Sequence, residues 1–352
     1  MKMVPLNKAV LLALASAVLF GLSTPLNKAL LGETAPITLA GLLYLGTAFV
    51  LAPVVYKQRM GVKRKNETSQ ASIFYLVGAV VFGGILGPIF LLLGLQLTLA
   101  GSVALLINLE TVATAIIAVL FFREHLGKKT WLANLGVFLS GIILSFSGGW
   151  EGFIGSVLVV IASICWGIDN NLTAKIDGLS PATSTFVKGL GAGPFNLALG
   201  LLLTGHVPAI HLILVGMVVG AFSYGISIVL YITAAQEMGA SRSQMIFASA
   251  PFWGLFFSIV FLREAFLLHQ VVATLLLVTS LYLMFTDSHS HHHEHGYLEH
   301  THPHDHSDPH HRHNHADHPF NDVAGQWHTH QPQAHNHPHW PDLHHRHTHT
   351  DD

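Results

Sequence analysis

The sequence has few charged residues for its length. Lys, Arg, Asp and Glu make up 10% of the 352 residues, whereas apolar residues make up 51%. A soluble domain has about 25% charged residues, so this shortage excludes a soluble fold for most of the chain. Cysteine is scarcer still: Cys165 is the only one, which excludes an intrachain disulfide.

Enzymatic motifs are missing as well. The sequence has no His-Glu-x-x-His zinc motif and no Gly-x-Ser-x-Gly elbow, and no nucleophile lies beside a base within the apolar segments. An intramembrane hydrolase is therefore disfavoured. We expect no catalytic residues, no required cofactor and no nucleic-acid partner.

What the sequence does have is a series of long apolar segments. Most are about 20 residues long, which as a helix matches the hydrocarbon thickness of a bilayer. They predict ten spans, at 9–31, 35–56, 72–96, 99–122, 130–147, 153–176, 182–204, 210–233, 240–262 and 266–286. The first resembles a signal peptide, but its repeat partner in mid-chain favours a retained helix.

The apolar part of the chain is a duplication. Phe121-Phe122-Arg123-Glu124 and Phe261-Leu262-Arg263-Glu264 close two spans 140 positions apart, and Phe20-Gly21 returns as Trp166-Gly167 at an offset of 146. Five spans in each copy force the second copy to enter the bilayer with the opposite orientation, which is the inverted-repeat plan of secondary transporters.

Positive residues in the short loops indicate the orientation. Lys57, Arg59 and the run 63–65 follow span two, and Arg123 with Lys128–Lys129 follows span four. Loops that follow even-numbered spans are therefore expected in the cytoplasm, together with both termini, in a multi-pass protein of the cytoplasmic (inner) membrane. We expect an all-α membrane protein with repeats at 1–147 and 148–286 and a tail at 287–352.

The tail has a different composition. Four of the 27 histidines precede it, so 23 lie in its 66 residues, with ten acidic residues and two arginines. Because it lacks the apolar surface that would offset chain entropy, we expect a disordered, histidine-rich cytoplasmic segment.

Many of these histidines alternate with other residues. Side chains two positions apart on an extended chain lie on the same side, so two imidazoles can reach one ion, and imidazole favours Zn, Ni, Co or Cu over Mg or Ca. The candidate metal ligands are His291, His292, His293, His295, His302, His304, His306, His310, His311, His313, His315, His328, His330, His335, His337, His339, His344, His345, His347 and His349.

Two other interpretations of the tail stay open. It could be a solvated spacer that binds metal incidentally. It could also sense pH, because protonating all 23 histidines around pH ~6.5 changes its charge from −8 (two minus ten) to +15.

Ionisable residues within the spans are candidate functional residues, because a charge at bilayer depth costs free energy unless it is paired or hydrated. Glu110 lies mid-span in span four, two residues after Asn108 and one helical turn before Thr114. Its repeat counterpart is Ala250, so the two halves differ here. The alternative is a carboxylate that only ties helices together.

A second candidate group lies in spans six and seven. Asp169, Asn170 and Asn171 are consecutive in span six, and Lys188 lies a few residues into span seven. Because span seven returns from the side that span six reaches, Asp169 and Lys188 should lie at similar depth, and we predict an ion pair or a shared water. A purely structural pair is the alternative.

Other polar and helix-breaking positions are given weaker roles. Lys28 and Lys175 lie near span ends, where we expect their side chains to reach the interface. Prolines are expected to interrupt spans one, three, seven and nine and to free carbonyls that line a cavity, at Pro25, Pro88, Pro194 and Pro251.

Together these features resemble the EamA type of the drug/metabolite transporter superfamily, over about residues 8–286. The resemblance depends on Phe20-Gly21, Trp166-Gly167, Arg123-Glu124 and Arg263-Glu264 within ten spans; segments such as Leu106-Ile107-Asn108-Leu109-Glu110 and the closing 341–347 resemble a bacterial subgroup with histidine-rich tails. It implies a small metabolite, export and proton coupling. One departure is that Leu42, Leu43 and Tyr44 occupy the region of span two where many relatives have a basic residue.

The leading hypothesis is a secondary transporter that works by alternating access, with substrate or coupling roles for Asn108, Glu110, Asp169, Asn170, Asn171 and Lys188. Glu110 or Asp169 would carry the coupling proton, and a second copy of the chain is a candidate partner. Two alternatives are a Ni, Co or Zn exporter that uses the tail as an ion collector, and a membrane-anchored metal sensor or buffer.

Overall fold

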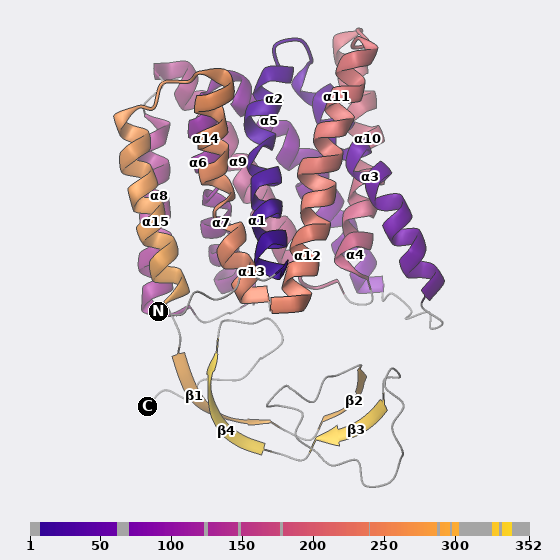
Figure 1. Cartoon of the computed structure of the whole chain (residues 1–352), viewed down its shortest axis with the longest axis vertical. Helices are drawn as coiled ribbons and strands as arrows, with labels where there is room; N and C mark the ends of the chain where they lie inside the picture. The colour runs from indigo at the N-terminus through magenta and orange to yellow at the C-terminus, as the bar shows by residue number, and fades with distance from the viewer. Residues whose placement is uncertain are drawn as a thin grey trace. The chain divides into compact units, whose positions relative to one another are not determined.

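The computed structural model describes residues 8–61, 70–122, 126–146, 149–176, 179–238 and 240–286, and the backbone of four strands in the tail. The chain divides into two compact units, Met1–Asp287 and Ser288–Asp352. The first unit is a bundle of helices that run along one common direction (Figure 1).

The helices follow the same order twice along the chain. The first set is α1 (Lys8–Gly21), α2 (Ser23–Leu30), α3 (Pro36–Gly61), α4 (Gln70–Ala79), the π-helix η1 (Val80–Leu86), α5 (Gly87–Leu97), α6 (Ala100–Leu106), α7 (Leu109–Phe122) and α8 (Lys128–Ser145). The second set is α9 (Gly149–Thr173), α10 (Pro181–Thr204), α11 (Ile210–Gly220), the π-helix η2 (Ala221–Ile226), α12 (Ser227–Met238), α13 (Ala240–Phe247), α14 (Ala250–Leu262) and α15 (Leu268–Phe285).

Eight of the ten predicted spans coincide with helices that are long and apolar enough to cross a membrane. Within the described residues they are Lys8–Leu30, Pro36–Gln58, Gln70–Leu97, Ala100–Phe121, Gly149–Thr173, Pro181–Thr204, Ile210–Ala235 and Ser243–Leu262. The protein is therefore a multi-pass membrane protein. The fifth and tenth predicted spans coincide with α8 and α15, which pack against each other. The apolar part of α15, Leu268–Met284, is shorter than the eight helices named above.

Several spans are interrupted, as the prolines indicate, but not at every proline. Pro25 follows the break between α1 and α2, Pro88 follows η1, and Pro251 begins α14 after the turn at 248–249. Pro194 was predicted to interrupt span seven, and this is wrong, because α10 continues through it. The second π-helix, η2, contains no proline, so a proline is not what produces it.

Helices approach closely at glycines. A β-carbon on Gly189 of α10 would lie 2.9 Å from the Tyr44 carbonyl oxygen of α3, and one on Gly193 would lie 2.9 Å from the Leu45 nitrogen. Such contact lets two apolar helices pack through their backbones, the dominant packing mode where lipid surrounds the bundle. This packing fixes α10, and therefore Lys188, relative to α3.

The tail was expected to be disordered, whereas its described parts have extended, paired backbone. β1 (His289–His295) pairs antiparallel with β4 (Gln333–His339), and β2 (Leu298–His302) pairs antiparallel with β3 (Gln326–His330). The alternating pattern repeats every two residues, as an extended strand does, and main-chain hydrogen bonds need no apolar core. The register sets His289 opposite His339, His291 opposite His337, and His293 opposite His335.

Candidate functional site

An ion pair joins α9 and α10, with Asp169 about one turn before the end of α9. Lys188 Nζ lies 2.6 Å from Asp169 Oδ1 and 2.8 Å from Oδ2, and it also donates to Thr173 Oγ1 at 3.1 Å. The two side chains are 13% and 10% exposed, so the charges are largely shielded from solvent and satisfy each other. This is the ion pair predicted from their similar depth.

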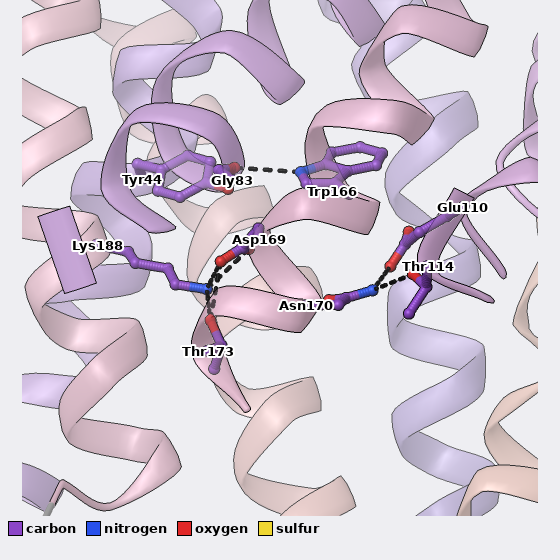
Figure 2. Close-up of polar contacts among 9 residues, drawn as sticks. All are labelled: Tyr44, Gly83, Glu110, Thr114, Trp166, Asp169, Asn170, Thr173 and Lys188. Atoms are coloured by element: carbon purple, nitrogen blue, oxygen red, sulfur yellow. Dashed lines mark hydrogen bonds and ion pairs between the residues drawn. The ribbon is translucent and has the colours of Figure 1, made fainter. Parts of the chain in front are cut away.

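Glu110 lies beside the next residue of α9, Asn170, and has a different kind of partner. Asn170 Nδ2 donates to Glu110 Oε1 at 2.7 Å and to Thr114 Oγ1 at 3.2 Å (Figure 2). Asn170 is exposed and Glu110 half-buried, although both lie within spanning helices. Successive residues of α9 therefore serve two networks, and the Glu110 carboxylate is held by neutral groups.

The Gly83 carbonyl in η1 accepts hydrogen bonds from two aromatic side chains that lie beside these networks. Tyr44 Oη donates to it at 2.7 Å and Trp166 Nε1 at 3.1 Å. A β-carbon on Gly83 would overlap the Asp169 carboxylate, so only glycine leaves room for the ion pair. Figure 2 shows Tyr44 on the Lys188 side and Trp166 toward Glu110. Sequence reasoning missed this carbonyl, because π-helical geometry leaves no compositional signal.

Two predicted site residues are not part of these networks. Asn108 Nδ2 donates to the Leu105 carbonyl at 3.1 Å, within its own helical turn. Asn171 Nδ2 donates to the carbonyls of Thr114 and Gly167, at 3.1 and 2.8 Å. Both amides bond to backbone carbonyls near the α6–α7 break and the α7–α9 contact, and their substrate or coupling roles stay predictions.

A row of aromatic rings continues from Tyr44 across the bundle. Tyr44 stacks on Tyr224 of η2 with centroids 6.5 Å apart, and Tyr224 meets Phe20 of α1 edge to face at 5.8 Å. Phe247 of α13 lies 5.4 Å from Phe20 and 5.2 Å from Tyr231 of α12. All five residues are half-buried. We call them the aromatic row; their sequence positions gave no signal, because they come from five separate elements.

Two charged residues clamp the connection between α5 and α6. Lys28 Nζ donates to the carbonyls of Leu95, Gln96 and Thr98 at 2.7, 3.1 and 3.0 Å, and Glu264 accepts from the amides of Ala100 and Gly101 at 2.7 and 2.9 Å. A cation on carbonyls at a helix C-terminus and an anion on amides at an N-terminus both complement the helix dipoles. Lys28 therefore caps the C-terminal end of α5, at the connection between two spans.

The candidate metal ligands lie in the tail unit. Ten of them have described backbone: His291, His292, His293, His295, His302, His328, His330, His335, His337 and His339. The other ten lie outside the described residues: His304, His306, His310, His311, His313, His315, His344, His345, His347 and His349. Among the residues whose side chains the structure describes, no group of three or more His, Cys, Asp or Glu could hold a metal ion.

Comparisons with known proteins agree with a transporter. The sequence profile of the EamA-like transporter family matches the chain twice, at residues 7–146 and 153–286. An uncharacterized transporter of Methanothermobacter thermautotrophicus is 25% identical over 292 residues, covering 77% of this chain and 84% of its own. The uncharacterized transporter YyaM of Bacillus subtilis is 22% identical over 220 residues, which are 59% and 70% of the two chains.

A solved crystal structure has a similar fold. It superposes with a TM-score of 0.56 at 16% sequence identity, and the match covers 79% of this chain and 95% of that one. At this level of identity the likeness concerns the fold alone.

Proposed function

The chain belongs to the EamA-like transporter family, and we propose that it is a secondary transporter that exports a small metabolite by alternating access. The residues of the polar networks at Glu110 and Asp169 belong to spanning helices, so they lie within the depth of the bilayer that a substrate has to cross. The positive loops favour the cytoplasmic membrane with both termini in the cytoplasm.

We further propose that ten spans form two inverted five-helix repeats. Three observations support this: the family profile matches twice, the two helix sets follow one order with a π-helix in each, and short helices α6 and α13 lie at opposite ends of the bundle (Figure 1). Alternating access would then be a rocking of one repeat against the other around the midplane networks.

The observation that carries the coupling mechanism is the difference between the two carboxylates. Asp169 is paired with Lys188 at 2.6 Å, whereas Glu110 accepts a hydrogen bond from the neutral Asn170 amide at 2.7 Å. An ion-paired carboxylate has little reason to take up a proton, because protonation would leave the cation buried without its counter-charge. Of the two candidates, Glu110 is therefore the proton carrier.

Replacing Glu110 tests this proposal. In proteoliposomes, Glu110→Gln should abolish substrate movement driven by a pH gradient, because Gln keeps the shape and the acceptor for Asn170 but cannot exchange a proton. The matched control is Glu33→Gln, which changes an exposed carboxylate after α2. Intact proton coupling in a folded Glu110→Gln protein would remove Glu110 from the mechanism.

For the tail we propose transition-metal binding, which the strand register supports by placing four pairs of histidines opposite each other, three between β1 and β4 and one, His300 with His328, between β2 and β3. A protein that ends after Thr286 should lose most Ni and Zn binding in equilibrium dialysis. If the protein is instead a metal exporter, deleting its gene should lower cellular tolerance of Ni, Co or Zn. Unchanged tolerance would reject the exporter alternative and leave binding by the tail unaffected.

A further inference from the structure

The charges of the two networks do not cancel. Glu110 and Asp169 contribute one negative charge each and Lys188 one positive charge, so with all three ionised the site carries −1 − 1 + 1 = −1. Among the side chains that the structure describes, the charged groups that act on Glu110 are those same two, Asp169 and Lys188, and the Tyr44 phenol is a further titratable group nearby. Lys28 is occupied by three carbonyls at the α5–α6 connection.

The site is also rich in aromatic side chains. Tyr44 and Trp166 meet at the Gly83 carbonyl between the two networks, and the aromatic row extends from Tyr44 through Tyr224 and Phe20. Aromatic faces attract organic cations by about 0.5–2 kcal/mol each, and they offer no such attraction to anions. Aromatic rings with one unbalanced carboxylate are therefore typical of sites for organic ammonium groups.

Resting on the proposed transport function, we infer that the substrate is an organic monocation: an ammonium group on an aromatic or apolar body. Its nitrogen pairs with the Glu110 carboxylate, and its body lies against Trp166, Tyr44 and Tyr224. Anionic metabolites are disfavoured, because Lys188 already pairs with both carboxylate oxygens of Asp169, at 2.6 and 2.8 Å, and so does not offer its charge to an anion. Asn170 can release Glu110 Oε1 and keep its second contact, Thr114.

The charge balance sets the exchange ratio. When the site is empty, Glu110 holds a proton; when the cation binds, that proton leaves to the water on the open side and the carboxylate pairs with the ammonium. One proton is exchanged for one cation, and the site is neutral in both states. Exchange should therefore follow the pH gradient and not respond to the membrane potential.

A matched series of indole compounds tests the inference with the full-length protein in proteoliposomes. The indole body stays constant while the charge changes: N,N,N-trimethyltryptammonium is a permanent cation, tryptophan a zwitterion, indole-3-ethanol neutral and indole-3-acetate an anion. We expect pH-driven uptake of the cation and on the order of tenfold or more weaker uptake of the anion, the scale of one charge-assisted contact. Clamping the potential with valinomycin and potassium should leave the rate unchanged.

The variants separate the outcomes. Glu110→Gln should bind the cation on the order of tenfold more weakly, whereas the exposed-carboxylate control Glu151→Gln should behave as the original protein. Proton-coupled uptake of the anion or the neutral compound at the same rate would overturn the cation inference and leave the transporter proposal intact. Cation binding that depends on Glu110 without uptake would support the site and overturn transport. Uptake that follows the membrane potential would overturn the one-to-one exchange.

Discussion

Two helix contacts in the bundle have the same geometry and different chemistry. On α9, a β-carbon at Gly167 would lie 2.8 Å from Ala113 Cβ and 2.9 Å from the Thr114 nitrogen of α7. On α1, a β-carbon at Gly21 would lie 2.7 Å from Trp253 Cβ and 2.9 Å from the Gly254 nitrogen of α14. The glycines are 146 positions apart, and so the contacts correspond in the two sets of helices.

The difference between these contacts lies in the polar residues one turn away. The α7–α9 contact has Glu110, Thr114 and Asn170, whereas position 250, which corresponds to Glu110, is a buried alanine. Close packing is thus present at both contacts, and ionisable chemistry at one. Packing and chemistry can diverge independently, because a glycine contact depends only on backbone distance.

The largest effect is expected from breaking the ion pair beside the α7–α9 contact. Lys188→Met leaves the Asp169 carboxylate shielded and unpaired, which should lower the free energy of unfolding by about 3–5 kcal/mol. Thermal unfolding in detergent measures it. The double variant Lys188→Met with Asp169→Asn removes both charges and should recover most of the loss; a double variant as unstable as the single one would show that packing, not charge, is lost.

A smaller loss of stability, equal at the two helix contacts, is expected from enlarging their glycines. Gly167→Val and Gly21→Val each force two helices apart, and each should cost about 1–3 kcal/mol by overpacking. The unfolding temperatures of the two variants should fall together. A loss confined to Gly167→Val would break the equivalence, since it would mean that α1 and α14 can separate without penalty.

The smallest effect is expected at the clamp. Glu264→Gln keeps an acceptor for one of the two amides at α6 but removes the charge, and should cost about 1 kcal/mol. Because a surface dipole interaction weakens with salt, the difference from the original protein should shrink at high ionic strength. A loss independent of salt would instead indicate a steric role for Glu264.

Much of the bundle could be predicted from the sequence. Apolar runs located the helices to within a few residues, because a bilayer sets their length, and the shared depth of Asp169 and Lys188 predicted their ion pair. The Glu110–Asn170 bond was harder to predict, although both residues were singled out. Their contact depends on how α7 and α9 rotate about their axes, which the glycine contact at Gly167 sets.

Other features had no sequence signal. The Gly83 carbonyl accepts two side chains because η1 widens the helical turn there, and glycine and valine in this segment are equally compatible with an ordinary helix. Asn108 and Asn171 were singled out because polar side chains are rare in spans, and the sequence did not indicate that their amides bond to backbone carbonyls. Polarity identifies such residues without saying what they bond to.

The Lys28–Glu264 clamp also ties together elements that lie far apart in the chain. Lys28 makes three hydrogen bonds to residues 67 to 70 positions away, and Glu264 makes two to residues 163 and 164 positions away. Lys28 lies in α2 and Glu264 follows α14, so the two residues come from distant parts of the chain. The α5–α6 turn can therefore separate from both α2 and the end of α14 only when the hydrogen bonds of Lys28 and those of Glu264 are all broken. Thermal motion of a single helix does not achieve that, so we expect the amide hydrogens at this end of the bundle to exchange slowly with solvent.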